Sequence, residues 1–264
     1  MGDYRRLGVV DGARLRFGEE AKEPGTWAGR RLMWLDDQPA FELSYWCGTC
    51  AFVFKRLEGA TSKVSFADAQ RRLGDGGDGL DESIIAMFGS VLPVGQYLPL
   101  LLRIVPRLIS PPSVDDYFAE DLPRIWNNDD GSWTTREYPQ TPYYRTCETV
   151  ADDGGLFYEF VVPMVPPRRN DRSTVEDYQD RLSVSAAPTA VAVSILDVRH
   201  PELDEDAGPD PFWGLTHFLL DGHNKMEAAA ITNRPLQLLS LMSINASLAN
   251  PEHIARLPDI LRRP

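Results

Sequence analysis

The feature that most constrains the fold is the stretch 216–244, THFLLDGHNKMEAAAITNRPLQLLSLMSI. It holds an apolar run that ends at Leu220, a polar segment over residues 221–225, a helix-favouring segment and a second apolar run. Short apolar runs bounded by turn residues are typical of buried strands, whereas Met, Glu and Ala favour a helix. The stretch therefore predicts a strand, a tight turn, a helix and another strand.

The predicted turn has the chemistry of an anion site. The first N–H groups of a helix lack partners within it, and the helix dipole adds partial positive charge there. Gly222 lets the backbone approach a phosphate closely, and His223 and Lys225 can donate hydrogen bonds to it. Asp221 can cap the helix, hold a metal ion or act as a base. We expect Lys225 to be exposed at this helix N-terminus, and a plain capped turn is the alternative interpretation.

The 264-residue chain is acidic, with a formal net charge of −12 and a pI of about 4.8. Such a balance repels phosphate backbones, so we expect no nucleic-acid partner. The N-terminal sequence holds no signal-peptide core, and the longest apolar run, 97–109, is broken by prolines and arginines. We therefore expect no membrane association and a cytoplasmic location, which the low count of three cysteines also fits.

Periodicity and turn residues predict three parts along the chain. Residues 1–125 form an N-terminal α+β region, residues 126–154 an ordered, aromatic-rich connector and residues 155–264 a C-terminal domain. In the first part the predicted elements are strands at 31–35 and 40–46 joined by a turn at 36–39, a helix beginning within 51–57, a helix from Ser65, a helix at 81–89 and strand-like pieces within 97–109. In the last part they are a strand at 157–165, a helix capped at Ser173, a strand at 188–198, the stretch 216–244 and a helix at 251–261.

The C-terminal part resembles the ParB/sulfiredoxin-like superfamily, over roughly residues 155–250. The family's hallmark is a Gly-x-x-Arg turn before a helix, often Asp-Gly-His-His-Arg in its stand-alone members. Asp221, Gly222 and His223 match this turn, and Asn224 occupies the variable position. Lys225 stands where the family has Arg, which keeps the charge but loses the two-pronged guanidinium.

The same family carries an arginine after the proline-rich exit of its first strand. The segment Pro166-Pro167-Arg168-Arg169-Asn170-Asp171-Arg172 fills that place, with Arg172 as the closest match. Three family features are missing from the sequence: the reactive cysteine of sulfiredoxins, the catalytic glutamate of the free-serine kinase and the DNA-binding helices of the partition proteins.

The resemblance implies an α/β (α+β) fold whose turn contacts nucleotide phosphates. It implies a nucleotide-dependent enzyme acting on a small molecule, by phosphoryl transfer or nucleotide hydrolysis, with ATP or ADP and Mg²⁺ as candidate cofactors. Asp221, His223 and Lys225 would be catalytic, and the nucleotide would contact Gly222, Asn224, Arg168 and Arg172. The alternative from another class is a non-catalytic protein that senses a ligand at this turn.

The segment Trp46-Cys47-Gly48-Thr49-Cys50 has a Cys-x-x-Cys spacing with three open interpretations. A dithiol oxidoreductase would place the first thiol at a helix N-terminus, where its pKa falls. A zinc site would add Cys147 as a third ligand and a histidine as the fourth. Reduced thiols packed at a strand end need no chemistry, and we favour this interpretation because the fourth zinc ligand is not visible.

Overall fold

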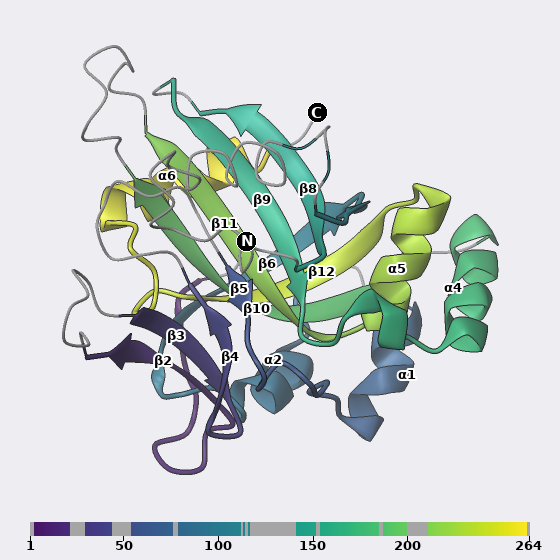
Figure 1. Ribbon diagram of the computed structural model, residues 1–264, viewed down its shortest axis with the longest axis horizontal. Helices are drawn as coiled ribbons and strands as arrows, with labels where there is room; N and C mark the ends of the chain where they lie inside the picture. The colour runs from purple at the N-terminus through teal and green to yellow at the C-terminus, as the bar shows by residue number, and fades with distance from the viewer. Residues whose placement is uncertain are drawn as a thin grey trace, which may run out of the picture.

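The computed structural model describes residues 3–21, 30–43, 54–75, 79–111, 113, 116, 141–151, 154–184, 187–199 and 211–262 (Figure 1). Its strands are β1 Arg5–Leu7, β2 Leu15–Glu20, β3 Arg30–Leu35, β4 Gln38–Glu42, β5 Lys55–Arg56, β6 Gly95–Ile104, β7 Arg107–Ile109, β8 Tyr143–Val150, β9 Leu156–Pro163, β10 Thr189–Arg199, β11 Phe212–Asp221 and β12 Leu236–Ser243. Its helices are α1 Ala67–Asp75, α2 Glu82–Gly89, the short 3₁₀ helix η2 Pro167–Arg169, α4 Arg172–Val184, α5 His223–Thr232 and α6 Pro251–Ile260.

A mixed eight-stranded sheet dominates the fold, with strand order β1-β6-β12-β10-β11-β9-β8-β7. Strands β9 and β11 run parallel, as do β10 and β12, while β10 and β11 are antiparallel. The carboxyl ends of β9 and β11 and the amino ends of β10 and β12 therefore meet at one edge of the sheet. Helices and a large mixed sheet together make an α+β protein. Strands from the predicted N-terminal and C-terminal parts pair within the same sheet.

A second, four-stranded sheet has the order β2-β3-β4-β5. Its central hairpin turns at Asp36 and Asp37, whose φ angles of 50° and 61° lie in the left-handed region favoured by two-residue hairpin turns. The turn predicted at 36–39 is thus confirmed at Asp36 and Asp37, while Gln38 and Pro39 already belong to β4. The helix expected within 51–57 is wrong in its described part, because Lys55 and Arg56 pair with β4 as strand β5.

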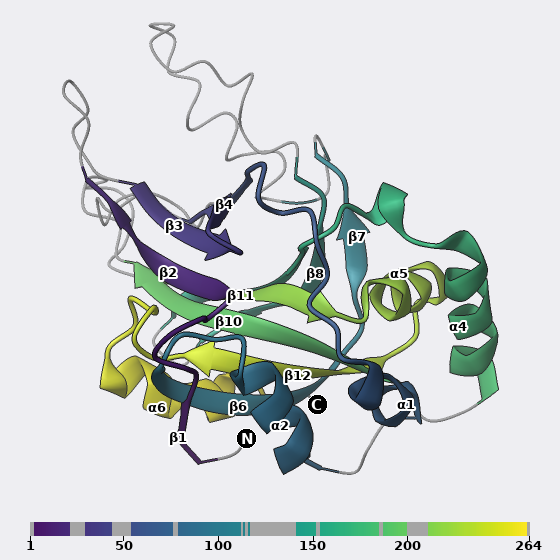
Figure 2. The same ribbon diagram turned by 90° about the horizontal axis from the view of Figure 1, so that it is seen from below.

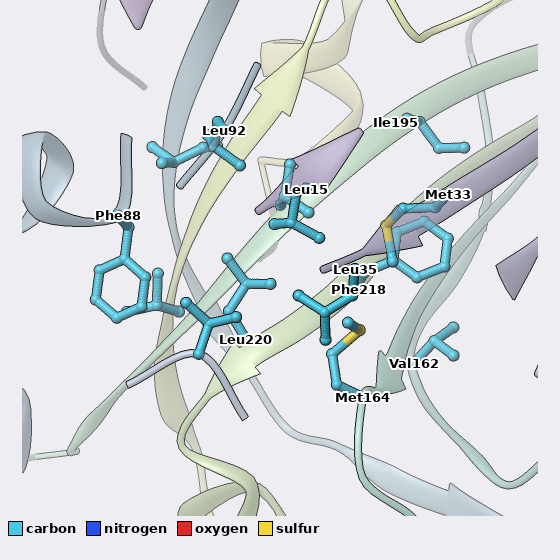
Figure 3. Packing of buried hydrophobic residues seen from close by; sticks show 14 of the residues in the cluster. Leu15, Met33, Leu35, Phe88, Leu92, Val162, Met164, Ile195, Phe218 and Leu220 are labelled. Atoms are coloured by element: carbon cyan, nitrogen blue, oxygen red, sulfur yellow. The ribbon is translucent and has the colours of Figure 1, made fainter. Parts of the chain in front are cut away.

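One face of the large sheet packs against the small sheet and helices α1 and α2 in a single apolar cluster (Figures 2 and 3). Alternate residues of β10 point into it, because successive side chains of a strand point to opposite faces. Val193 and Phe218 from the large sheet are fully buried there, and the Phe218 ring lies 5.2 Å from that of Phe41. Burying each such side chain stabilises the fold by about 1.5–3 kcal/mol.

The opposite face of the large sheet is covered at two places. Helices α4 and α5 pack side by side over small residues such as Ala190 and Ala192, and α6 packs over Trp213 and Leu215 (Figure 2). Small side chains on β10 let α5 approach the sheet closely. Helix α5 is therefore held against the sheet edge where the carboxyl ends of β9 and β11 meet. Within the described residues, no helix combines the length and apolar character needed to cross a membrane.

The order of elements from β9 to β12 agrees with the prediction, but one cap does not. Helix α4 begins at Arg172, and Asp171 instead of Ser173 caps it by accepting the N–H of Thr174 at 2.7 Å. The hydroxyl of Ser173 donates to the same carboxylate at 2.7 Å. The cap shifts because η2 ends just before, so the chain enters the helix two residues earlier than the Ser-x-x-Glu pattern indicates.

Candidate functional site

The turn between β11 and α5 is a left-handed corner at Gly222. Its φ is +90°, a conformation that other L-residues adopt with strain. A Cβ atom built on Gly222 would lie 2.8 Å from the Cβ atom of Ala190 on β10, closer than real contacts allow. Packing against β10 alone therefore requires glycine at this position, whether or not a phosphate approaches it.

Lys225 lies at the third position of α5 and is buried, with 5% exposure. Its Nζ atom donates to the carbonyl oxygens of Leu73 at 3.0 Å and Thr189 at 2.9 Å. Burial lowers the pKa of Lys225 to about 8, although the nearby Asp221 carboxylate opposes the shift. The expectation that Lys225 is exposed is wrong. Its side chain runs beneath the helix to the end of α1 and the start of β10, where two backbone carbonyls bind the ammonium.

His223 begins α5 and is buried, with 2% exposure. Its Nε2 atom accepts the backbone N–H of Val165 at 3.2 Å, so the proton of the neutral ring sits on Nδ1. Burial lowers the pKa of His223 well below its ordinary value, and the positive charges of Lys63 and Arg56 add to the effect. His223 is therefore a neutral donor at pH 7. Its Nδ1 atom has no hydrogen-bond partner among the described residues.

An ion pair between Arg172 and Glu227 joins the start of α4 to α5. The two Nη atoms of Arg172 donate to the two carboxylate oxygens of Glu227, at 2.8 and 2.6 Å. The side-chain amide of Asn170 donates to the same carboxylate at 2.7 Å and to the carbonyl of His223 at 3.3 Å. Arg172, a predicted nucleotide contact, is thus already engaged by a carboxylate. Sequence reasoning missed Asn170 and Glu227, which lie outside the recognised turn.

Four cations gather around this corner, and we name them the cationic cluster: Arg56, Lys63, Arg168 and Arg169. Arg168 and Arg169 are exposed on η2, whereas Arg56 lies in β5 and Lys63 in the segment that follows it. The guanidinium of Arg56 donates to carbonyl oxygens at 2.9 Å (Ala60) and 2.7 Å (Met164), and also to Pro163.

The positive charges of the cationic cluster lie close enough to affect one another's pKa values. Burial, together with the smaller effects of the positive charges of Arg169 and Arg168, lowers the pKa of Arg56 to about 10. Burial also lowers the pKa of Lys63, against the opposing effect of Asp221, Asp171 and Glu227. Arg56 and Lys63 lie more than a hundred residues before the turn in sequence, so spacing gave no signal for them.

The segment 61–65, which we name the strap, lies along the end of β11. The backbone N–H of Val64 donates to the carbonyl of Leu220 at 3.0 Å. The hydroxyl of Ser65 donates to Oδ1 of Asp221 at 3.2 Å. The strap therefore brings Lys63 and Ser65 to Asp221, the last residue of the strand.

The turn, the loop after β9 and the strap thus bring together all the predicted site residues of the C-terminal part, but in unequal roles. Asp221 has 9% exposure, Asn224 is partly buried and Arg168 is exposed. The Oδ1 atom of Asn224 is buried without a hydrogen-bond partner among the described residues. Asp221 can offer Mg²⁺ one carboxylate, and this ion commonly takes its other ligands from phosphates and water.

Cys47 and Cys50, the residues of the predicted zinc or dithiol site, lie outside the described residues. Cys147 lies in β8, partly buried, and packs against the apolar cluster beneath α6. In the described part of the chain, no three His, Cys, Asp or Glu side chains come together as a metal site would require.

A separate cavity of about 490 Å³ lies between β1, the start of β6 and Asn245. Because Tyr97 of β6 pairs with Ser243 at the end of β12, this cavity lies at the opposite end of the strands from the turn. It therefore shares no residue with the site described above.

Comparisons with protein-family models, with characterised proteins and with solved structures found no match.

Proposed function

We propose that the protein is a nucleotide-dependent enzyme acting on a small molecule, by phosphoryl transfer or nucleotide hydrolysis at the turn between β11 and α5. The observation that carries this proposal is the cationic cluster, which collects four positive charges at the N-terminus of α5. The chain as a whole carries a net charge of −12, so such a local excess calls for an anionic ligand.

The electrostatics support a phosphate at this place. Burial is the main reason that the pKa of Arg56 is lowered, and the repulsion from Arg169 and Arg168 that adds to it is relieved when an anion binds between the cations. The first N–H groups of α5 add donors and a partial positive charge at the same point. In phosphoryl transfer most of the catalysis is positioning and neutralisation of charge, which these groups would supply.

The proposal assigns new roles to several residues. Lys63, Arg168 and Arg169 contact the phosphates in place of Lys225, whose ammonium is engaged by two carbonyls. His223 donates from Nδ1 as a neutral ring. Asp221 acts as the base or as the ligand of Mg²⁺.

A panel of nucleotides with and without Mg²⁺, read by thermal shift, tests the proposal. A ligand that binds only the folded protein raises its apparent stability, by about 2.7 kcal/mol at a hundredfold excess over the dissociation constant. ATP or ADP should raise the melting temperature, whereas adenosine, which lacks phosphates, should not. Equal shifts with adenosine and ATP, or no shift with any nucleotide, would contradict a phosphate site.

The second candidate is a non-catalytic protein that senses the same ligand. It is favoured by the burial of His223 and Lys225, two of the three residues assigned to catalysis. A steady release of inorganic phosphate or ADP from ATP, above that of a Lys63→Met variant, separates the enzyme from the sensor. Binding without any turnover would favour the sensor.

A further inference from the structure

Ser65 presents an exposed hydroxyl whose proton points at a carboxylate. Its Oγ atom donates to Oδ1 of Asp221 at 3.2 Å and accepts from Nε2 of Gln70 at 3.4 Å. Ser65 does not cap α1, because the N–H groups of Ala69 and Gln70 bond to the carbonyl oxygen of Phe66. The Ser65 hydroxyl is therefore positioned by Asp221 and Gln70, and not by a role in capping the helix.

This pair has the geometry of a phosphoryl acceptor and its base. In protein kinases an aspartate accepts the proton of the hydroxyl that attacks the γ-phosphate. Ser65 and Asp221 reproduce that contact, and both lie beside groups suited to phosphate. Lys63 precedes Ser65 by two residues on the same strap, and α5 begins two residues after Asp221.

We propose that Ser65 is a phosphorylation site of the protein, modified by the nucleoside triphosphate that binds at the cationic cluster. The inference rests on the function proposed above. The Oγ atom of Ser65 attacks the γ-phosphorus, and an O–P bond forms while the bond from that phosphorus to the bridging oxygen breaks. Asp221 takes the hydroxyl proton, and the nucleoside diphosphate leaves.

Two neighbouring groups would stabilise a phosphoserine at position 65, and one would repel it. A phosphoserine carries a charge of about −1.5 to −2 at pH 7, which the ammonium of Lys63 and the N-terminus of α1 both favour. The same charge repels Asp221, and the Ser65 hydroxyl proton is gone. The bond that ties the strap to the end of β11 through Ser65 and Asp221 is therefore lost on phosphorylation.

The test is the mass of the intact full-length protein after incubation with ATP and Mg²⁺, followed by peptide mapping. The wild type should gain the mass of one phosphoryl group, located on Ser65. Ser65→Ala should gain none, and Ser65→Thr should regain it because it keeps the hydroxyl. Asp221→Asn should slow the reaction by about 100-fold, the usual contribution of a positioned base. The matched control is Ser62→Ala, which removes another exposed serine of the same strap and should behave as wild type.

Nucleotide binding is measured on each variant by thermal shift, so that the two proposals can fail separately. Wild-type protein that binds ATP but gains no phosphoryl group, or gains it equally in Ser65→Ala, overturns the assignment of Ser65 and leaves the proposed function standing. Protein that binds no nucleotide overturns both. Urea midpoints equal to that of wild type show that Ser65→Ala and Ser65→Thr are folded.

Discussion

The ammonium of Lys225 lies 3.0 Å from the carbonyl oxygen of Leu73, which joins the first turn of α5 to the last turn of α1. Arg181 of α4 donates to the next carbonyl, that of Gly74, at 2.8 Å. Unpaired carbonyls at a helix C-terminus carry partial negative charge, and cations there are stabilising. The two side chains thus hold α1 against α4 and α5, beside the candidate site.

Replacing Lys225 with Met should weaken the fold more than it weakens ligand binding. The change removes a buried donor and leaves the carbonyls of Leu73 and Thr189 without it, which costs about 1–3 kcal/mol. Urea unfolding should show a loss of that size. Lys63→Met serves as the control, because no hydrogen bond holds Lys63 in the described structure and its loss should change the unfolding free energy little. A Lys225→Met variant with wild-type stability and no affinity for nucleotides would contradict this structural role.

The stability of the wild type should rise with pH between about 8 and about 10 more steeply than that of Lys225→Met. The pKa of Lys225 is about 8 in the folded state, below the ordinary value of 10.5. In that window the unfolded chain binds more protons, so alkali favours the folded state. Above pH 10 Tyr97 opposes this trend, because burial raises its pKa to about 12 and the unfolded chain then releases that proton first. Parallel pH profiles for the two proteins would contradict the buried, charged lysine.

His223 should make the protein sensitive to acid in the range where few carboxylates titrate. Its folded pKa lies well below 6.5, so the unfolded chain takes up the proton first and stability falls as the pH drops below about 6.5. His223→Gln keeps an acceptor for the N–H of Val165 but cannot titrate. Its unfolding free energy should stay level between about pH 7 and 5.5 while that of the wild type declines. Equal declines in both proteins would show that other groups cause the effect.

Gly222→Ala should destabilise the protein by more than Gly12→Ala does. Both glycines have left-handed φ angles, +90° and +80°, so each alanine pays about 1–2 kcal/mol of backbone strain. A Cβ at Gly12 meets nothing within 4 Å, whereas at Gly222 it meets Ala190 at 2.8 Å, which adds about 1–3 kcal/mol of overpacking. The double variant Gly222→Ala/Ala190→Gly should recover part of the difference. Equal losses of unfolding free energy in the two variants would contradict this prediction, because they would show that the close contact with β10 does not destabilise Gly222→Ala.

Local patterns predicted much of the fold. The stretch 216–244 gave its strand, turn, helix and strand, and the apolar alternation of 188–198 gave β10. These predictions depend on residues that lie close together in the sequence, within the same helix or strand, so the sequence alone is enough to make them. The α+β class is observed, while the kinship with the ParB/sulfiredoxin-like superfamily stays a prediction.

The composition of the site was less predictable, because it depends on segments far apart in sequence. The turn pattern indicated Asp221 and Gly222, but only tertiary packing decides that Lys225 turns beneath the helix toward Leu73. Nothing near Arg56 or Lys63 in sequence signals that strand β5 and the strap deliver them to α5. The gathering of positive charge around these residues becomes visible only when their neighbours are known.

The most direct test of the central claim is the affinity of ATP for the wild type and for Lys63→Met, measured by calorimetry at low salt. Loss of one charge-assisted contact to phosphate should weaken binding by about ten-fold or more. Arg71→Ala is the matched control, because it removes an exposed cation from α1 outside the cationic cluster and should leave the affinity unchanged. The account predicts a loss for Lys63→Met alone. Equal affinities for all three proteins, or no ATP binding by the wild type, would contradict it.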